Sequence, residues 1–383
     1  FILLKQGLID EYKFADEQGV CDFVKQAGCI QFDPIDVCGK NAELVLQSRV
    51  KGFTKAMLNH LLYEERKLLD YFDKNLSIIS TADWPYFARI REAYRQNTRS
   101  YDEVKAVTEE IKDTIRKKGN VCSKDVGFNK KVDWYWSDTK LARAALETLY
   151  FQGDLIIHHK KGTSKYYAFT EEHLPAAILT AEDPHQTEFE YLKWRALRRI
   201  SAVGLLWNKP SAAWLGIEDF KAAERNAIFT KLILESKILQ IEVENIKDSF
   251  YCLASDEELI ETVLTNPTLA ARTELIAPLD NMLWDRKLIK TIFNLEYKWE
   301  IYTPKAQRQY GHYVLPILSG EQFVGRAELV NEKKAQRLVV KNVWLENGVK
   351  TSSYLESDIA DCFQRFATFN QCELRDAATW HHR

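Results

Sequence analysis

Residues 141–169 read LARAALETLYFQGDLIIHHKKGTSKYYAF, and this stretch decides the expected fold. Three apolar residues recur at a spacing of four in its first part: Leu141, Ala145 and Leu149. That spacing predicts a helix with one apolar face, which Gly153 is expected to end. Two runs typical of β-strands follow, 155–158 and 166–169. The stretch therefore predicts a helix that leads directly into a hairpin.

The same pattern returns 84 residues later in the chain. Five apolar or aromatic positions are matched at this offset: Leu149, Leu155, Ile157, Tyr167 and Phe169 by Ile233, Leu239, Ile241, Tyr251 and Leu253. A helix followed by such a hairpin is typical of winged-helix DNA-binding modules. The first hairpin carries Lys160, Lys161 and Lys165, which are candidates for phosphate contacts, whereas the second hairpin, 242–248, is acidic. Two copies predict an extended surface that faces DNA.

The expected fold class is mainly α with a β part: tandem winged-helix (helix-turn-helix) domains plus a C-terminal β-barrel. Helical periodicity predicts helices in the first hundred residues at 15–26, 41–50, 54–69 and 82–94. Alternation near the C-terminus predicts strands at 299–302, 313–318, 322–328 and 338–346, with a closing helix at 354–369. The expected domains are a winged-helix-like domain that carries the strand-like run at 29–37 (1–100), two winged-helix domains (101–180 and 181–266) and the barrel (267–383).

Composition excludes several classes of protein. The chain has 383 residues, 46% of them hydrophobic and 28% charged, which is typical of a globular protein with several domains. Its net charge of −2 argues against a nonspecific nucleic-acid coat, although a basic face remains compatible with it. Seven cysteines lie far apart with no CxxC, so we expect reduced thiols, no metal and a cytoplasmic location. No apolar run has the length of a membrane span.

The clearest candidate for chemistry is Gln31-Phe32-Asp33, within a strand-like run at 29–37. On an extended strand, residues two apart face the same side, so Gln31 and Asp33 are expected to project together. Gln31 would orient a water molecule and Asp33 would accept its proton. The alternative is that Asp33-Pro34 only begins a turn.

A second candidate lies at 303–312, between two expected strands. It is interpreted as a long hairpin tip that carries Lys305, Arg308, Tyr310 and His312, side chains suited to phosphate contacts or to entering a DNA groove. The alternative is an ordinary solvated loop.

These motifs resemble those of the bacterial winged-helix DNA glycosylases of the YcaQ/AlkZ type, which unhook interstrand crosslinks. The resemblance covers essentially the whole chain. It rests on five segments: 30–33, 44–49, 153–167, 278–286 and 310–316. The catalytic strand carries Gln-apolar-Asp, as in the YcaQ-like branch. The chain departs from many relatives in having Asn41 and its neighbours where those carry histidines.

The resemblance implies a function. It implies monofunctional, metal-independent hydrolysis of the N-glycosidic bond of N7-alkylated purines, with Gln31 and Asp33 as catalytic residues and no cofactor. It also implies that the expected barrel inserts a hairpin into the duplex. The expected DNA-binding residues are Arg49, the lysines of the first hairpin and the side chains of the 303–312 segment. The expected partner is double-stranded DNA with alkylated or crosslinked purines. A monomer acting on the bacterial nucleoid is expected, without membrane association.

Two other classes of function fit parts of the sequence. A non-catalytic winged-helix protein, such as a transcription regulator, would share the helix and hairpin, but regulators commonly dimerise and the chain has no coiled-coil pattern. A nuclease would need a cluster of metal-binding carboxylates, which the sequence does not suggest.

Overall fold

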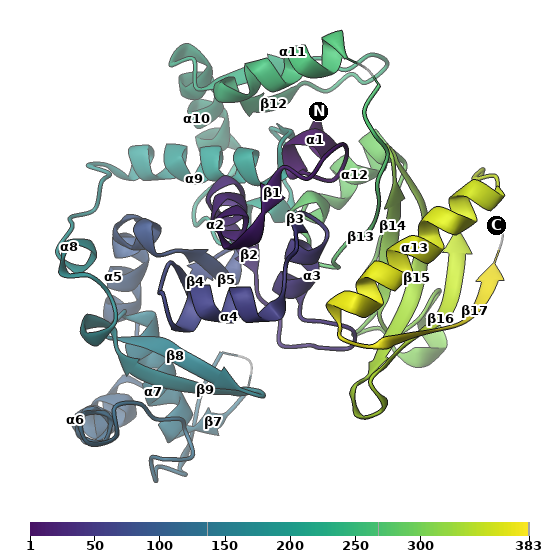
Figure 1. Cartoon of the computed structure of the whole chain (residues 1–383). Helices are drawn as coiled ribbons and strands as arrows, with labels where there is room; N and C mark the ends of the chain where they lie inside the picture. The colour runs from purple at the N-terminus through teal and green to yellow at the C-terminus, as the bar shows by residue number, and fades with distance from the viewer. Residues whose placement is uncertain (136, 267, 382–383) are drawn as a thin grey trace. The chain divides into compact units, whose positions relative to one another are not determined.

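The structure is a computed structural model that describes residues 1–135, 137–266 and 268–381. The chain divides into two compact units (Figure 1). Unit 1 comprises Phe1–Leu58, Phe72–Ile78 and Phe189–Arg383, and unit 2 comprises Asn59–Tyr71 and Ile79–Glu188. Unit 1 is thus assembled from three separate stretches of chain, whereas four consecutive domains were expected; those four domain boundaries stay a prediction.

The α-helices are α1 (Ile2–Gln6), α2 (Asp16–Ala27), α3 (Asn41–Gln47), α4 (Lys55–Tyr63), α5 (Ala88–Gln96), α6 (Tyr101–Lys118), α7 (Leu141–Phe151), α8 (Ala176–Leu179), α9 (Glu188–Val203), α10 (Ala222–Leu234), α11 (Glu257–Thr265), α12 (Arg286–Phe293) and α13 (Ser353–Phe369). The strands are β1 (Phe14–Ala15), β2 (Cys29–Gln31), β3 (Val50–Lys51), β4 (Leu68–Asp73), β5 (Asn75–Ser80), β6 (Lys131–Val132), β7 (Thr139–Lys140), β8 (Leu155–Lys161), β9 (Ser164–Phe169), β10 (Leu206–Trp207), β11 (Ile238–Ile241), β12 (Phe250–Leu253), β13 (Thr273–Leu275), β14 (Val314–Ser319), β15 (Gln322–Glu332), β16 (Arg337–Leu345) and β17 (Glu373–His381).

Unit 2 contains the helix and hairpin that the opening stretch predicts. Helix α7 buries its apolar face, and Gly153 follows it in the left-handed region with φ +84°, a conformation that glycine adopts without steric cost. Strands β8 and β9 pair antiparallel, with Lys161 opposite Ser164, so the turn is Gly162-Thr163. The predicted elements are confirmed, and their role as a DNA-binding wing stays a prediction.

The second copy of the helix and hairpin lies in unit 1, and it matches the first copy only in part. Helix α10 leads into β11 and β12, to which β10 adds a third strand. Leu155 pairs with Phe169 in the first hairpin, but Ile238, not Leu239, pairs with Leu253 in the second. The second hairpin therefore pairs one residue out of step with the offset of 84, because apolar matching alone does not determine register.

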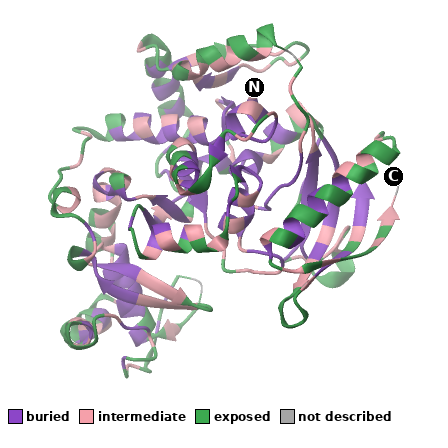
Figure 2. Ribbon diagram, viewed as in Figure 1, coloured by how far each residue is buried: buried purple, intermediate pink, exposed green. Residues whose placement is uncertain are grey.

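The C-terminal strands form an open five-stranded sheet, in the order β13-β14-β15-β16-β17. Over the described residues β13 and β17 do not pair with each other, so the expected closed barrel is wrong. Strand β17 joins β16 in parallel, and the connection between them is helix α13 (Figure 1). This helix packs against the sheet through its apolar face and is exposed along the other (Figure 2). A helix-covered sheet and a barrel share the same strand alternation, so the sequence pattern did not separate them.

The strand β2 belongs to a three-stranded sheet in the order β2-β5-β4. This sheet was not expected, because 54–69 was predicted to be one helix. Helix α4 instead ends at Tyr63, and the apolar residues from Leu68 onward form β4. No helix within the described ranges combines the length and apolarity needed to cross a bilayer.

Candidate active site

The side chain of Gln31 stands at the end of β2, where three segments of unit 1 meet. The main-chain N–H of Phe32 donates to Leu76 O on β5 at 2.9 Å. Asn41 Nδ2 donates to Gln31 O at 2.8 Å, while Asn41 Oδ1 accepts from the N–H of Leu279 at 3.0 Å. Asn41 therefore ties the candidate strand to the 278–286 segment, at the position where many relatives were expected to carry histidine.

Lys74 contacts the Gln31 side chain and was not identified from the sequence. It occupies the turn between β4 and β5, and its Nζ donates to Gln31 Oε1 at 3.0 Å. The Lys74 Nζ also lies over the ring of Trp284, 5.0 Å from its centroid. The signal that could have revealed this residue is Asp73-Lys74-Asn75, a polar turn between two apolar runs.

Asp33 lies beyond the end of β2, so the strand is shorter than expected and regular alternation stops at Gln31. Its Oδ1 accepts from the N–H of Ile35 at 2.8 Å. This is the geometry of a turn that begins at Asp33-Pro34, the alternative to a catalytic role. Among the described residues no other hydrogen bond to this carboxylate is recorded, which leaves Oδ2 available. Burial raises the pKa of Asp33 above its ordinary value, and the bond from Ile35 opposes that rise.

Two tyrosines of the C-terminal region lie close enough to Asp33 to sense its charge. The pKa values of Tyr302 and Tyr313 are raised, in each case first by burial and additionally by the Asp33 carboxylate. Tyr313 is buried, whereas Tyr302 is 76% exposed. Tyr302 was not singled out from the sequence, and its ring is exposed.

The segment 303–312 is an irregular loop rather than the tip of a hairpin. The expected strand at 299–302 is not formed: Glu300 is buried in irregular backbone, and Ile301 and Tyr302 form a turn. The Glu300 carboxylate accepts main-chain N–H groups from Gln309 (2.9 and 3.1 Å), Tyr310 (2.9 Å) and Gly311 (3.3 Å). Because one buried carboxylate satisfies several N–H groups, this loop has a defined conformation without strand pairing.

The four candidate DNA contacts of this loop differ in exposure. Lys305 and His312 are exposed, and Arg308 is partly exposed with its Nε bonded to Thr303 O at 2.8 Å. Tyr310 is partly buried, and the guanidinium of Arg326 lies 4.0 Å from its ring centroid. The loop thus presents two cationic side chains and one imidazole on its surface.

Arg49 lies in the core of unit 1. Its side chain is fully buried, and its guanidinium pairs with the equally buried Asp280 at 2.8 Å. The same guanidinium lies over the ring of Phe23. The burial argues against the expected DNA contact, and we interpret Arg49 as a structural partner of the 278–286 segment.

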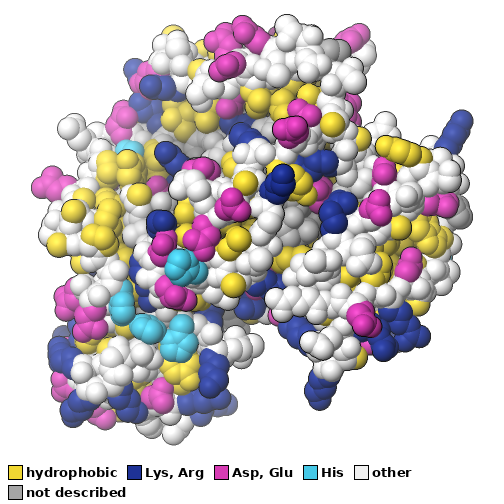
Figure 3. All heavy atoms as spheres, viewed as in Figure 1, with side chains coloured by type: hydrophobic (Ala, Val, Ile, Leu, Met, Phe, Trp, Pro, Cys, Tyr) yellow, Lys and Arg dark blue, Asp and Glu magenta, His cyan; other side chains and the backbone are white. Residues whose placement is uncertain are grey.

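The three wing lysines of unit 2 have different environments. Lys161 is exposed at the end of β8. Lys160 pairs with the buried carboxylate of Asp70 at 2.5 Å. Lys165 is half-buried, and burial lowers its pKa below the ordinary value. Figure 3 shows Lys and Arg side chains gathered with acidic ones over the end of unit 2 that carries α6, α7 and the hairpin.

A cluster of buried charges lies immediately beside Lys74 in unit 1. The Asp73 carboxylate pairs with three arginines of α9: Arg195 at 2.9 Å, Arg198 at 2.6 Å and Arg199 at 2.6 Å. Burial opposes ionisation of Asp73, but Arg199 and the other two guanidinium groups hold its pKa far below the usual range. One carboxylate therefore faces three cations, and Lys74 adds a fourth positive charge to this group.

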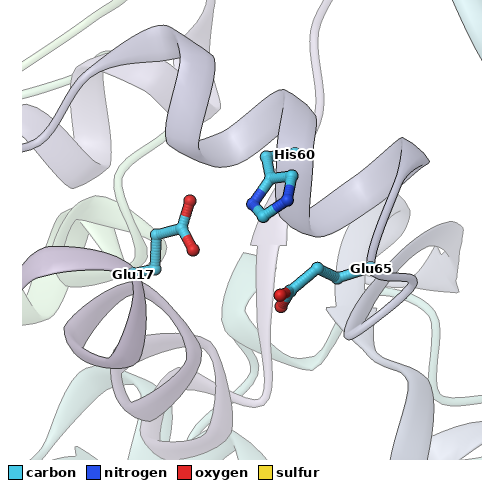
Figure 4. Close-up of side chains that lie close together, drawn as sticks. All are labelled: Glu17, His60 and Glu65. Atoms are coloured by element: carbon cyan, nitrogen blue, oxygen red, sulfur yellow. The ribbon is translucent and has the colours of Figure 1, made fainter.

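Figure 4 draws three side chains of types that ligate metals, Glu17, His60 and Glu65. Glu17 belongs to unit 1 and the other two to unit 2, so we build no site from them. Within unit 2, Glu65 already pairs with Lys67 at 2.6 Å.

Comparison with known proteins places this geometry in a family. The model of the family described as DNA glycosylase AlkZ-like matches residues 24–369. The structure is similar to that of the Streptomyces sahachiroi DNA glycosylase AlkZ, with a TM-score of 0.61 and 13% sequence identity, over 99% of this chain and 97% of that chain. At this identity the structural likeness shows a shared fold, and the family match covers the candidate site around Gln31 and Asp33. The chain belongs to the AlkZ-like family of DNA glycosylases, hydrolases that act on DNA.

Proposed function

We propose that this protein hydrolyses the N-glycosidic bond of N7-alkylated purines in duplex DNA, as a monofunctional enzyme without a metal. The observation that carries the proposal is the Asp33 carboxylate, two residues along the chain from Gln31, whose Oδ2 accepts no hydrogen bond among the described residues. A carboxylate can stabilise the sugar cation and accept a proton from water, and an amide can orient that water.

The chemistry follows from the charge on the lesion. Alkylation at N7 makes the purine cationic, so the base leaves with the electron pair of the C1′–N9 bond and becomes neutral. The sugar is left with oxocarbenium character, which the negative charge of Asp33 stabilises. A water molecule then adds its oxygen to C1′ and gives a proton to Asp33. No strong general acid is needed, in keeping with so small a set of side chains.

The same reaction accounts for unhooking an interstrand crosslink. Each purine of an N7–N7 crosslink carries the same cationic leaving group, so hydrolysis at one C1′ frees that strand from the tether. Crosslinked duplex should therefore yield separated strands on a denaturing gel when the enzyme is present.

DNA binding is proposed to be electrostatic and shared between the two units. The proposed contacts are the exposed residues Lys161, Lys305 and His312, together with the partly buried Arg308, Tyr310, Lys160 and Lys165. Phosphate contacts from such side chains position a duplex without reading its sequence. We further propose a monomer that acts on nucleoid DNA in the bacterial cytoplasm.

The test is release of N7-methylguanine from a duplex that contains it, with undamaged duplex of the same sequence as control. Free base and alkali-labile abasic sites are expected, with no strand break before alkali and no covalent complex after borohydride. Strand cleavage without alkali would contradict the monofunctional assignment. Tight duplex binding with no base release would instead support the non-catalytic DNA-binding alternative.

A further inference from the structure

We propose that Lys74 is a positioning residue that holds the Gln31 amide with its oxygen turned inward, so that Nε2 is presented to the attacking water. This inference rests on the proposed function and deepens it, because it assigns which end of Gln31 faces the reaction.

The geometry of Lys74 suits a fixed donor. Its main-chain oxygen accepts from Ser77 Oγ at 3.0 Å, and Asn75 follows it with φ +57°, which defines a tight turn. The Lys74 side chain is 5% exposed and rests on the face of Trp284. The ammonium group therefore has little freedom to move away from Gln31 Oε1, 3.0 Å distant.

The chemistry of the pair determines the amide orientation. An ammonium group has only donors, whereas a glutamine amide has one acceptor oxygen and one donor NH₂ group. Oε1 must therefore face Lys74, and the amide cannot flip without bringing two donors together. The structure records no acceptor for Gln31 Nε2 among the described residues, so this donor is left for solvent.

This orientation complements Asp33. A water molecule that attacks C1′ has to be held by a donor and relieved of a proton by an acceptor. Nε2 of Gln31 supplies the donor, and the open Oδ2 of Asp33 supplies the acceptor. With the amide flipped, both side chains would accept protons from the water, and no donor of Gln31 would hold the water oxygen.

The surroundings of Lys74 make the pair sensitive to alkali. The charged and titratable groups around its ammonium are Arg199 on α9, Arg286 at the start of α12, Asp73 on β4 and Cys29 on β2. Burial first, and then the charges of Arg199 and Arg286, lower the pKa of Lys74 to about 8. Above that pH the neutral amine can accept as well as donate a hydrogen bond, so it no longer excludes the flipped amide.

The decisive experiment is a double-mutant cycle in single-turnover excision of N7-methylguanine. Lys74→Met should lower the rate constant by about tenfold, the effect of one charge-assisted hydrogen bond, with duplex affinity unchanged. In a Gln31→Ala background the same substitution should have no further effect. Equal losses in both backgrounds would overturn the proposal, because a purely structural role is additive.

Two further variants guard against misfolding. Lys74→Arg keeps a donor-only cation and should recover part of the rate. Gln31→Glu keeps the partner for Lys74 but removes Nε2, and should excise as slowly as Gln31→Ala; wild-type excision by this variant would contradict the role of Nε2. The matched control is Lys5→Met, which removes another buried lysine, paired with Asp256, outside the candidate site.

A measurement that does not depend on catalysis separates this proposal from the proposed function. In protein labelled with ¹⁵N-glutamine, the Gln31 side-chain signal, assigned with Gln31→Ala, should shift as the pH passes through about 8 and lose this response in Lys74→Met. If that response is present but no base is excised, only the proposed function fails. If excision occurs but the response is absent, only the role of Lys74 fails.

Discussion

Glu300 Oε2 accepts the main-chain N–H of Tyr310 at 2.9 Å, and the same carboxylate also accepts from the two neighbouring residues. A loop that carries proposed DNA contacts is thereby held by one buried side chain. Tyr302 immediately precedes this loop, and the charge of Asp33 contributes to raising its pKa.

Glu300→Gln should loosen the loop and lower excision several-fold, because a neutral amide accepts hydrogen bonds more weakly than a carboxylate. Binding of undamaged duplex should change less. The measurement is single-turnover excision beside a binding titration. Glu296→Gln is the matched control, since Glu296 is exposed and pairs with Lys290 in the preceding segment. Equal effects of the two substitutions would remove Glu300 from the mechanism.

Acid should reproduce the effect of Glu300→Gln. Burial would raise the pKa of Glu300, but the N–H groups of Gln309, Tyr310 and Gly311 outweigh it and hold this pKa below the ordinary value. The carboxylate therefore stabilises the loop at neutral pH, and that contribution is lost as the pH falls through the lowered pKa. Proteolysis within the loop should accelerate there in wild type and show no such pH step in Glu300→Gln.

Asp33→Asn should separate catalysis from binding. The change removes both the negative charge and the proton acceptor, so excision should fall roughly 10²–10⁴-fold while duplex affinity stays nearly unchanged. Gln31→Ala should cost less, because water still reaches Asp33. Asp36→Asn, three residues along and paired with Lys333, serves as control and should excise at the wild-type rate. If Asp33→Asn excises at the wild-type rate, Asp33 and the strand before it have only a structural role.

The pH dependence should report the same carboxylate. Burial raises the pKa of Asp33, and the reactive form is the ionised one. The rate should therefore fall as the pH is lowered through this raised pKa, at a higher pH than for an ordinary aspartate. The measurement is the pH profile of single-turnover excision, and the acidic limb should be absent from the residual activity of Asp33→Asn.

Charge reversal at Lys161 and charge removal at its neighbour Lys160 should give different results. Lys161→Glu should weaken duplex binding with little sequence dependence and reduce the salt dependence, because an exposed phosphate contact is lost. Lys160→Met should mainly destabilise unit 2, by ~3 kcal/mol, since Asp70 is left buried without its ion-pair partner. Salt-dependent binding titrations and denaturant unfolding distinguish the two outcomes. Unchanged binding by Lys161→Glu would show that the β8–β9 hairpin does not contact DNA.

Arg49→Met should act on stability and leave DNA contact alone. Asp280 would remain as an uncompensated buried charge, at a cost of roughly 3–5 kcal/mol in the free energy of unfolding. Asp280→Asn in the same chain should relieve part of that loss. Duplex affinity of the folded fraction should equal that of wild type; a weaker affinity would restore Arg49 as a DNA contact.

The sequence by itself determined the elements whose signal is local. The apolar spacing of four in α7 and the turn at Gly162 are complete within a few neighbouring residues, so helix and hairpin were predicted where they lie. The same holds for β14, β15, β16 and α13. Gln31 and Asp33 were also singled out from their spacing, although β2 ends at Gln31 and the expected strand alternation does not extend to Asp33.

Only the tertiary structure decided what each charged side chain contacts. Lys74 reaches Gln31 across 43 residues of chain and Arg49 reaches Asp280 across 231, and neither partnership leaves a local pattern. The open sheet was decided in the same way, by the parallel addition of β17 behind α13. The physical reason is that periodicity reflects backbone geometry over a few residues, whereas burial and ion pairing depend on which distant segments the folded core brings together.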